Sequence, residues 1–283
     1  MDKPKSNLER ILIYLGLSLV GLIFLSPFLY MVSISLASDA TNAKGAFTLL
    51  PKEYEWKNYI RVFTGRENMG LYIWNSVKLS LWCIAGQVLA SSFVAFGFAR
   101  LRARGNKVIF LVLLATMMIP QDVYIIPQFM LFKQIGWIDT YLPMIVPNFA
   151  GGAFNIFLLR QFFMSVPISL DEAAKIDGLS YFGIYSRIIL PLMKPILIAI
   201  ALFTFQFNWG WFYGPLVFLQ DSAKYPLAVA LRVIQASQGN AVPNWHYVMV
   251  GSVFLTIPPL MGYFFGQKYM LEANITAGSS TLK

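Results

Sequence analysis

Long apolar runs separated by short polar loops form the dominant pattern of this chain. A transmembrane helix needs about 20 consecutive and mostly apolar residues, and six runs are long enough. The pattern therefore predicts an all-α integral membrane protein with six transmembrane helices in one domain. The six predicted spans are residues 11–36, 73–99, 108–132, 143–163, 196–219 and 247–266.

Three of these runs carry further local signals. The segment "IPQDVYIIP" interrupts the third run, so we expect that span to end near Pro120 and the remainder to lie along the outer interface. The fifth run contains Asn208, Trp209, Trp211 and Pro215, which leaves the position of its outer end open. The first run precedes "SLA", a sequence that resembles a signal-cleavage site. Its apolar stretch is far longer than the roughly 7–15 residues of a signal core, so we expect an uncleaved anchor.

The composition agrees with a membrane protein and excludes several kinds of site. The chain is 57% hydrophobic and 12% charged, whereas soluble domains carry about 25% charged residues. One cysteine and one histidine cannot supply an intrachain disulfide, a cysteine cluster or a histidine-rich metal site, so no metal site is predicted. The sequence contains no Gly-Lys dipeptide and hence no P-loop. If ATP drives this protein, another chain must bind it.

The distribution of charge predicts the orientation in the membrane. With the N-terminus inside, the inner segments hold 13 bases and six acids, and the outer segments hold eight bases and seven acids. The positive-inside rule therefore places both termini, and the polar loop at residues 165–195, in the cytoplasm. The net charge of +9 is spread over these loops, which indicates membrane topology rather than nucleic-acid binding. On the outer side, "KYPLAVALRV" favours a short surface helix.

The most polar helix-like segment is "SLDEAAKIDGLSYFGIYSRIILP", from Ser169 to Pro191. Ser169 stands three residues before Glu172, the spacing of a capping box. Asp177 and Gly178 supply a stop, because glycine suits a left-handed residue at a helix C-terminus. These signals predict a first short helix that lies outside the bilayer.

A second short helix is predicted to follow directly. Ser180 can cap its start, and Pro191 is expected to end it. In the first helix, the small residues Ala173 and Ala174 would let a partner's surface approach the backbone closely, with charged side chains around them. The alternative is an ordinary solvated helix at the membrane surface, and the local sequence leaves both open.

The spacing within this segment resembles the EAA loop of ABC-importer permease subunits. The matching pattern is Glu172-Ala173-Ala174, three residues, Gly178, nine residues, Ile188, one residue, and Leu190-Pro191. The resemblance implies that the first helix is a coupling helix docking into a cleft of an ATPase subunit, and that ATP and magnesium bind to that partner and no cofactor to this chain. The implied coupling residues are Asp171, Glu172, Ala173, Ala174, Asp177, Gly178, Ile188, Leu190 and Pro191.

Other segments resemble the second permease of maltose-type carbohydrate importers. These are "LLRQFFMSVP", "NWGWFYGPLVFL" and the tail "ITAGSSTLK". The resemblance implies a single permease domain over residues 1–283 in a bacterial inner membrane. Its implied partners are a homologous second permease, two ATPase subunits and an extracytoplasmic solute-binding protein. It also implies that Thr276, Ala277 and Gly278, within a cytoplasmic tail at 267–283, contact the ATPase, although Ser279 and Ser280 replace more apolar residues. A free terminus is the alternative for this tail.

Polar and aromatic side chains at membrane depth are candidates for a translocation path. Amide groups can hydrogen-bond sugar hydroxyls, and aromatic faces suit the apolar faces of sugar rings. The same residue types also form interfacial belts and helix–helix contacts, so this alternative stays open. The candidate path residues are Asn148, Asn155, Gln206, Asn208, Trp209, Trp211 and Tyr213, with Gln87 as a further amide at this depth.

The sequence thus favours a non-catalytic permease subunit for a carbohydrate, with an oligosaccharide as the expected cargo. A self-sufficient secondary transporter or channel is the alternative. Ionisable residues within spans, which usually mark ion pathways, are almost absent from this chain, and this argues against the alternative. An intramembrane enzyme is disfavoured because no recognisable catalytic set is present. The residues do not select a particular sugar.

Overall fold

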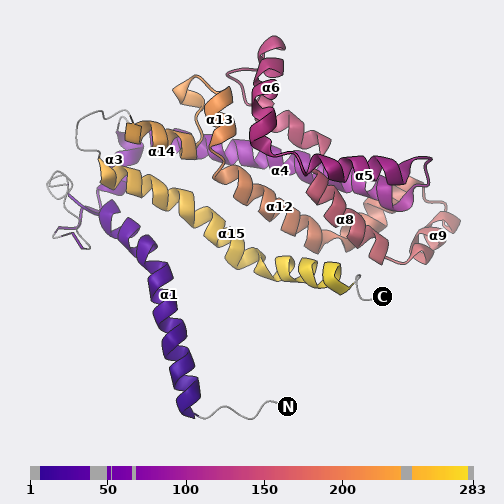
Figure 1. Cartoon of the computed structure of the whole chain (residues 1–283), viewed down its shortest axis with the longest axis horizontal. Helices are drawn as coiled ribbons and strands as arrows, with labels where there is room; N and C mark the ends of the chain where they lie inside the picture. Colours follow the sequence, from indigo (N-terminus) through magenta and orange to yellow (C-terminus); the bar gives the residue numbers. More distant parts are fainter. Residues whose placement is uncertain (1–6, 39–49, 52, 66–67, 237–243, 280–283) are drawn as a thin grey trace. The chain divides into compact units, whose positions relative to one another are not determined.

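The computed structural model is built from helices and the loops that connect them (Figure 1). It describes the chain except for residues 1–6, 39–49, 52, 66–67, 237–243 and 280–283, and except for the side chains of residues 270–279. Within this described part, the one β-type pairing is an isolated bridge between Ala37 and Tyr54. The fold is therefore all-α, as predicted.

The helical elements are α1 (Asn7–Ser35), α3 (Asn58–Thr64), α4 (Met69–Arg100), α5 (Asn106–Thr116), α6 (Gln121–Gln134), α7 (Leu142–Ile145), η1 (Val146–Ala150), α8 (Ala153–Ser165), α9 (Ile168–Ile176), α10 (Tyr181–Ile184), η2 (Tyr185–Ile189), α11 (Leu190–Leu192), α12 (Lys194–Trp209), α13 (Tyr213–Phe218), η3 (Ser222–Lys224), α14 (Leu227–Ala236) and α15 (Trp245–Ser279).

Four helical stretches are long and apolar enough to cross a membrane by themselves. They are Asn7–Ser35, Met69–Arg100, Leu142–Ser165 and Trp245–Tyr269, and they coincide with the first, second, fourth and sixth predicted spans. Two bent helix pairs account for the other apolar runs: α5 with α6, and the stretch Tyr181–Leu192 with α12. The predicted number of six spans holds if each bent pair counts as one span.

The third predicted span breaks near Pro120, as its sequence indicated. Helix α5 ends at Thr116, α6 begins at Gln121, and the two axes differ by 98°. Pro120 has extended backbone angles, with φ −61° and ψ 142°. Proline lacks an N–H group and disfavours the helical conformation of the residue before it, which explains the break.

The fifth predicted run, whose outer end the sequence left open, is not one continuous helix. Helix α12 ends at Trp209, and the next residues leave the helix before α13 begins at Tyr213. Residues 210–219 therefore do not continue α12. A continuous helix would require a hydrogen bond from residue 215 to the carbonyl of residue 211, and Pro215 has no N–H to donate. Proline is tolerated in the first turn of the separate helix α13.

The chain divides into two compact units. The first contains Met1–Gly70 and Leu231–Phe254, and the second contains Leu71–Ala230 and Leu255–Lys283. In the first unit, the Asn58 side-chain amide donates to the carbonyl oxygens of Ser35 and Ala37, at 3.1 and 2.9 Å. These bonds join the end of α1 to the start of α3.

The second unit holds the main apolar core, and this core supports the polar segment. Residues of α4, α8, α9, η2 and α12 meet in one buried cluster. Among the fully or almost fully buried members are Phe96, Leu159, Phe163 and Ile189. The short helix α9 is therefore attached to the helical bundle by packing as well as by the chain.

Candidate functional site

Helix α9 is a defined short helix with a sharp C-terminal turn. It covers Ile168–Ile176, and Gly178 follows with φ at 83°, in the left-handed region. The Gly178 amide donates to the Lys175 carbonyl at 3.0 Å, and the Leu179 amide donates to the Ala174 carbonyl at 3.0 Å. These two bonds satisfy carbonyl groups that the helix end would otherwise leave without partners. The predicted glycine stop is confirmed.

The two predicted caps had different outcomes. The capping box at Ser169 was wrong, because the cap position lies two residues earlier, at Pro167, and has no side-chain hydrogen bond. Pro167 has an extended backbone conformation and stands directly before the helix, so α9 starts at Ile168. The Ser180 cap is confirmed, since its hydroxyl oxygen accepts a 3.2 Å hydrogen bond from the Gly183 amide.

Pro191 does not end the second short helix, which corrects that prediction. The helix widens into a π-helical turn at η2, and Pro191 then lies in the first turn of α11. Proline is tolerated there because the first N–H groups of a helical segment need no internal partner. The direction changes at Met193 instead, and α12 leaves at 78° to the preceding stretch.

Helix α9 has one exposed face and one buried face. Glu172, Ala173 and Ile176 are exposed, and Ile176 lies four residues after Glu172 and three after Ala173, so the three share one side of the helix. Ile176 is 87% exposed, the largest value among the large hydrophobic residues of this helix. Ala174 is 3% exposed and packs into the main core. The two alanines of the motif therefore have different environments.

The carboxylate of Asp171 also faces inward, where it pairs with a base at the end of α4. Its Oδ2 lies 3.0 Å from Nε of Arg100, and the two side chains are 9% and 4% exposed. The Arg100 Nη2 group also donates to the Val166 carbonyl at 2.8 Å. One guanidinium thus holds the chain on both sides of Pro167. The sequence interpretation missed this role, because it counted Arg100 only among the bases of an inner loop.

The tail residues Thr276, Ala277 and Gly278 belong to the last turns of α15. Their side chains, and residues 280–283, lie outside the described part of the chain. The predicted ATPase contact of this tail therefore remains a prediction.

A cavity of about 760 Å³ brings together several of the candidate path residues. Asn148, Asn155, Asn208 and Trp211 line it, together with Gln87 of α4. Its walls come from α4, α6, α8, α12 and the bends that flank them.

Three candidate path residues lie elsewhere. Trp209 is buried and donates a 2.9 Å hydrogen bond from Nε1 to the Leu255 carbonyl, so it joins α12 to α15. Tyr213 is 66% exposed, and neither it nor Gln206 lines the cavity. The sequence could not separate these residues from the cavity residues, because the type of side chain is the same in both groups.

The cavity wall is polar but uncharged. No Asp, Glu, Lys, Arg or His occurs among the described residues that line it. The Oδ1 atom of Asn208 is buried without a hydrogen-bond partner in the described part of the chain. Such a wall can exchange hydrogen bonds with an uncharged polar solute. The carboxamide and hydroxyl side chains that line it are Gln87, Thr116, Gln121, Tyr124, Gln128, Asn148, Asn155, Thr204 and Asn208.

The bend before α8, at Gly151 and Gly152, lies against helix α4 at the cavity wall. Gly151 has φ at 80°, and the Gly152 amide donates to Oγ of Ser91 on α4 at 3.3 Å. A Cβ atom at Gly152 would meet the amide of Gln87, so a larger residue would displace the Gln87 side chain from its position in the cavity wall. The position of α4 therefore helps to determine the shape of the cavity wall.

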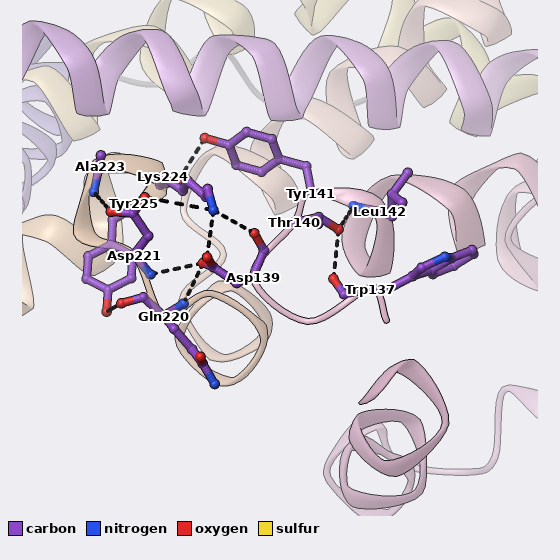
Figure 2. A network of polar contacts seen from close by, with 10 residues as sticks. All are labelled: Trp137, Asp139, Thr140, Tyr141, Leu142, Gln220, Asp221, Ala223, Lys224 and Tyr225. Carbon is purple, nitrogen blue, oxygen red and sulfur yellow. Dashed lines mark hydrogen bonds and ion pairs between the residues drawn. The ribbon is translucent and has the colours of Figure 1, made fainter. Parts of the chain in front are cut away.

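Near the other end of α4, a polar network joins the α6–α7 loop to the segment after α13 (Figure 2). The Asp139 carboxylate accepts hydrogen bonds from the Gln220 and Asp221 amides at 3.0 and 2.9 Å. Lys224 Nζ lies 2.6 Å from Oδ2 of Asp139, and the Tyr141 hydroxyl donates to the Lys224 carbonyl at 2.9 Å. We call the contacts of Asp139 with Gln220, Asp221 and Lys224 the Asp139 clasp.

These contacts change the acidity of the clasp residues. The hydrogen bond from Lys224 and those from the Asp221 and Gln220 amides lower the pKa of Asp139 to about 2. The hydrogen bond with Asp139 raises the pKa of Lys224 above its usual value. Both shifts favour the charged pair. The sequence interpretation missed the clasp, although Asp139 has φ at 61°, a conformation that aspartate tolerates better than most residues.

Helix α4 connects the clasp region with the Arg100–Asp171 pair. Asn75 of α4 donates to the carbonyls of Ala223 and Tyr225, at 2.8 and 3.1 Å. From Asn75 to Arg100 the helix rises by about 38 Å, at 1.5 Å per residue. That length exceeds the roughly 30 Å of a bilayer's hydrocarbon core. The two polar sites can therefore lie at opposite faces of a membrane.

The described residues contain no group of three or more histidine, cysteine, aspartate or glutamate side chains that could hold a metal ion. The one cysteine, Cys83, is a buried free thiol.

Sequence comparisons place these features in a known family. The family model of the binding-protein-dependent transport system inner membrane component matches residues 87–271. The chain is 29% identical over 277 residues to the arabinooligosaccharides transport system permease protein AraQ of Bacillus subtilis (strain 168), and the match covers 97% of each chain. It is 31% identical over 274 residues to the trehalose/maltose transport system permease protein MalG of Thermococcus litoralis, covering 96% of this chain and 97% of that protein.

Solved structures give the same result. A chain in the crystal structure of a bacterial ABC transporter involved in the import of the acidic polysaccharide alginate superposes with a TM-score of 0.80 and 26% identity. The superposition covers 95% of this chain and 99% of that chain. With the family model matching well over half of its length, this multi-pass membrane protein belongs to the binding-protein-dependent transport system inner membrane components, the non-catalytic permease subunits of ABC importers.

Proposed function

We propose that this chain is a permease subunit of an ATP-driven carbohydrate importer and that α9 couples it to the ATPase. The observation that carries the coupling role is the exposed face of α9, with Glu172, Ala173 and Ile176 side by side and Gly178 directly after them. A protruding isoleucine beside a charge, on a helix whose other face is anchored in the core, suits insertion into a partner's groove.

The remaining motif residues support this surface from behind. Asp171 and Ala174 are buried within the chain, so they fix α9 rather than extend its exposed face. Ile188, Leu190 and Pro191 belong to the helical stretch that follows the turn. In the proposed mechanism, closure of two ATPase subunits, which bind ATP and magnesium, displaces α9 and thereby moves the helices around the cavity.

The proposed cargo is an oligosaccharide. The uncharged cavity wall with its carboxamide groups and Trp211 offers hydrogen bonds to sugar hydroxyls and an aromatic face to sugar rings. Two of the relatives are named for arabinooligosaccharide and trehalose/maltose transport. Asn148, Asn155 and Asn208 are the residues that we assign to the path in this chain.

The proposed assembly contains a homologous second permease, two ATPase subunits and an extracytoplasmic solute-binding protein. One solved structure similar in fold is an alginate transporter in complex with a periplasmic protein that holds an alginate pentasaccharide. The excess of bases in the inner loops supports a bacterial inner-membrane location with both chain termini in the cytoplasm. The last turns of α15, with Thr276, Ala277 and Gly278, are proposed as a second ATPase contact.

The coupling role is tested by changing the exposed face of α9. Glu172→Lys should leave the protein in the membrane and abolish co-purification of the ATPase, because it reverses a charge on the docking surface. Glu53→Lys is the matched control, an exposed acid in the loop before α3, and it should behave as the wild type. Normal co-purification of the ATPase with Glu172→Lys would refute the coupling role.

A glycine pair separates docking from backbone strain. Gly178 and Gly136 have φ at 83° and 73°, and a Cβ added at either glycine would meet no atom within 4 Å. Leucine at either position therefore carries a similar conformational cost, of about 1–2 kcal/mol. We expect Gly178→Leu to abolish ATPase association and Gly136→Leu to retain it.

The cargo and the tail need separate measurements. A screen of neutral oligosaccharides on the assembled importer, read as stimulation of ATP hydrolysis, should identify the cargo class. Stimulation by no sugar in this screen would contradict the assignment. Deletion of residues 275–283 should lower cargo-stimulated ATP hydrolysis while assembly largely survives, and unchanged hydrolysis would mean that the tail makes no functional contact.

A further inference from the structure

We infer that Arg100 is the positioning residue that makes α9 and α4 move as one body, so that displacement of α9 reaches the cavity wall. This inference rests on the proposed coupling function of α9 and adds the route by which it acts.

The first step of the argument is the double contact of one guanidinium. Arg100 pairs with Asp171 on α9 at 3.0 Å and donates to the Val166 carbonyl, which precedes α9, at 2.8 Å. The chain between these two contacts contains Pro167, where α8 and α9 join. The side chain thus spans the junction at which α9 could otherwise pivot relative to α8.

The second step is the burial of the pair. The Arg100 and Asp171 side chains are only 4% and 9% exposed and lie in the wall of a cavity of about 1050 Å³. Neither Nε of Arg100 nor Oδ1 of Asp171 makes a hydrogen bond in the described part of the chain, so the 3.0 Å contact is an ion pair. Arg100 is the one ion-pair partner of Asp171 in the described part of the chain, and separation of the two helices would leave a largely buried charge unpaired.

The third step is a second connection between the same two regions. The hydroxyl groups of Ser92 on α4 and Tyr185 on η2 are 2.8 Å apart and buried. Tyr185 and Ala174 of α9 belong to the same buried core cluster. Helix α4 is thus joined to the polar segment before and after the turn at Gly178.

The fourth step leads from α4 to the cavity. Nine residues (about two and a half turns) before Arg100 on the same helix, Ser91 accepts the hydrogen bond from Gly152, and Gln87 one turn further lines the cavity. A rigid α4 that follows α9 would therefore shift the bend at Gly151–Gly152. This gives a contiguous physical path from the proposed docking surface to the cavity wall.

The test uses Arg100→Lys, which keeps a positive charge beside Asp171 but loses the planar fork that reaches two acceptors. The complete importer is placed in proteoliposomes with its binding protein, and cargo transported per ATP hydrolysed is measured. We expect ATPase association and hydrolysis to persist, and cargo moved per ATP to fall by about fivefold. Arg102→Lys is the matched control, an exposed base two residues further along, and it should keep the wild-type ratio.

A distance measurement checks the same inference without a transport readout. Spin labels on Ser169→Cys and Arg104→Cys report the separation of α9 and the end of α4, and the native Cys83 is buried. The distance should stay the same between resting and vanadate-trapped importer, and should change on trapping once Arg100→Lys is added. A distance that changes equally with the native Arg100 would overturn the inference.

The outcomes separate this inference from the proposed function. A wild-type cargo-to-ATP ratio in Arg100→Lys, with Glu172→Lys still abolishing association, would remove the role of Arg100 and leave the coupling helix in place. Proportional loss of assembly, hydrolysis and transport in Arg100→Lys would reduce Arg100 to a folding role. Retained association with Glu172→Lys would instead refute the proposed function itself.

Discussion

The same pairing of an aspartate with a base occurs toward both ends of α4, in two different environments. Near its C-terminal end, Arg100 and Asp171 are 4% and 9% exposed. Near its N-terminal end, Lys224 and Asp139 are 38% and 30% exposed. Asp139 has several hydrogen-bond donors, whereas one oxygen of Asp171 has none in the described part of the chain.

The difference indicates what each site depends on. A buried charge that loses its partner is strongly destabilising, because the protein interior cannot solvate it. In a partly exposed pair, water can solvate either side chain if its partner is lost, so the ion pair itself adds little stability. Hydrogen bonds from backbone amides to the carboxylate then contribute much of the stabilisation. The Arg100–Asp171 pair therefore depends on the identity of both side chains, and the Asp139 clasp depends mainly on the oxygen atoms of Asp139.

Arg100→Ala should have the largest effect on the stability of the fold. Removing one partner of the buried pair should lower the free energy of unfolding by about 3–5 kcal/mol, measured by reversible unfolding in mixed micelles. The double variant Arg100→Met/Asp171→Leu should recover most of this loss, because no unpaired charge remains. Equal losses in the single and double variants would show that shape rather than charge determines stability at this site.

A smaller effect is expected for Asp139→Ala. Its loss removes the acceptor for the Gln220 and Asp221 amides and frees Lys224, but water can reach all three groups. The free energy of unfolding should fall by less than it does in Arg100→Ala. Hydrogen exchange at the Gln220 and Asp221 amides should become clearly faster. Unchanged exchange at both amides would contradict the clasp.

The pH dependence of stability should distinguish the Asp139 clasp further from the Arg100–Asp171 pair. Folding lowers the pKa of Asp139 from 3.8 to about 2, so the clasp adds stability above pH 3.8 and loses it as the pH falls toward 2. The difference in unfolding temperature between wild type and Asp139→Asn should be constant from pH 5 to neutral and should shrink between about pH 4 and pH 2. Lys224→Met, which removes the main cause of the shift, should move this decline to higher pH.

Salt should have the smallest effect on stability, and it should weaken the Lys224–Asp139 pair but not the Arg100–Asp171 pair. Raising the ionic strength from 0.1 to 1 M shortens the Debye length from about 10 to about 3 Å. The stability difference between wild type and Lys224→Met should decrease in high salt, and the difference between wild type and Arg100→Ala should not. A parallel decrease in both would mean that the Arg100–Asp171 pair is accessible to solvent ions.

The sequence alone determined the features that depend on neighbouring residues. Apolar length predicted the spanning helices, Pro120 predicted the break in the third span because proline cannot donate a hydrogen bond, and Gly178 predicted the end of α9 because glycine accepts a left-handed backbone. The error at Pro191, and the open end of the fifth span near Pro215, had a local origin as well. Pro191 and Pro215 lie in first turns, where proline is tolerated, and the sequence did not reveal where those turns begin.

Only the tertiary structure decided which polar residues meet. Arg100 and the Val166 carbonyl are 66 residues apart in the chain, and Asp139 and Lys224 are 85 apart. No local pattern relates residues at such separations, because their contact depends on how α4, α8 and the later helices pack. The same packing buries Ala174, exposes Ala173, and places Asn208 at the cavity but Trp209 against α15, although each pair is adjacent in the sequence.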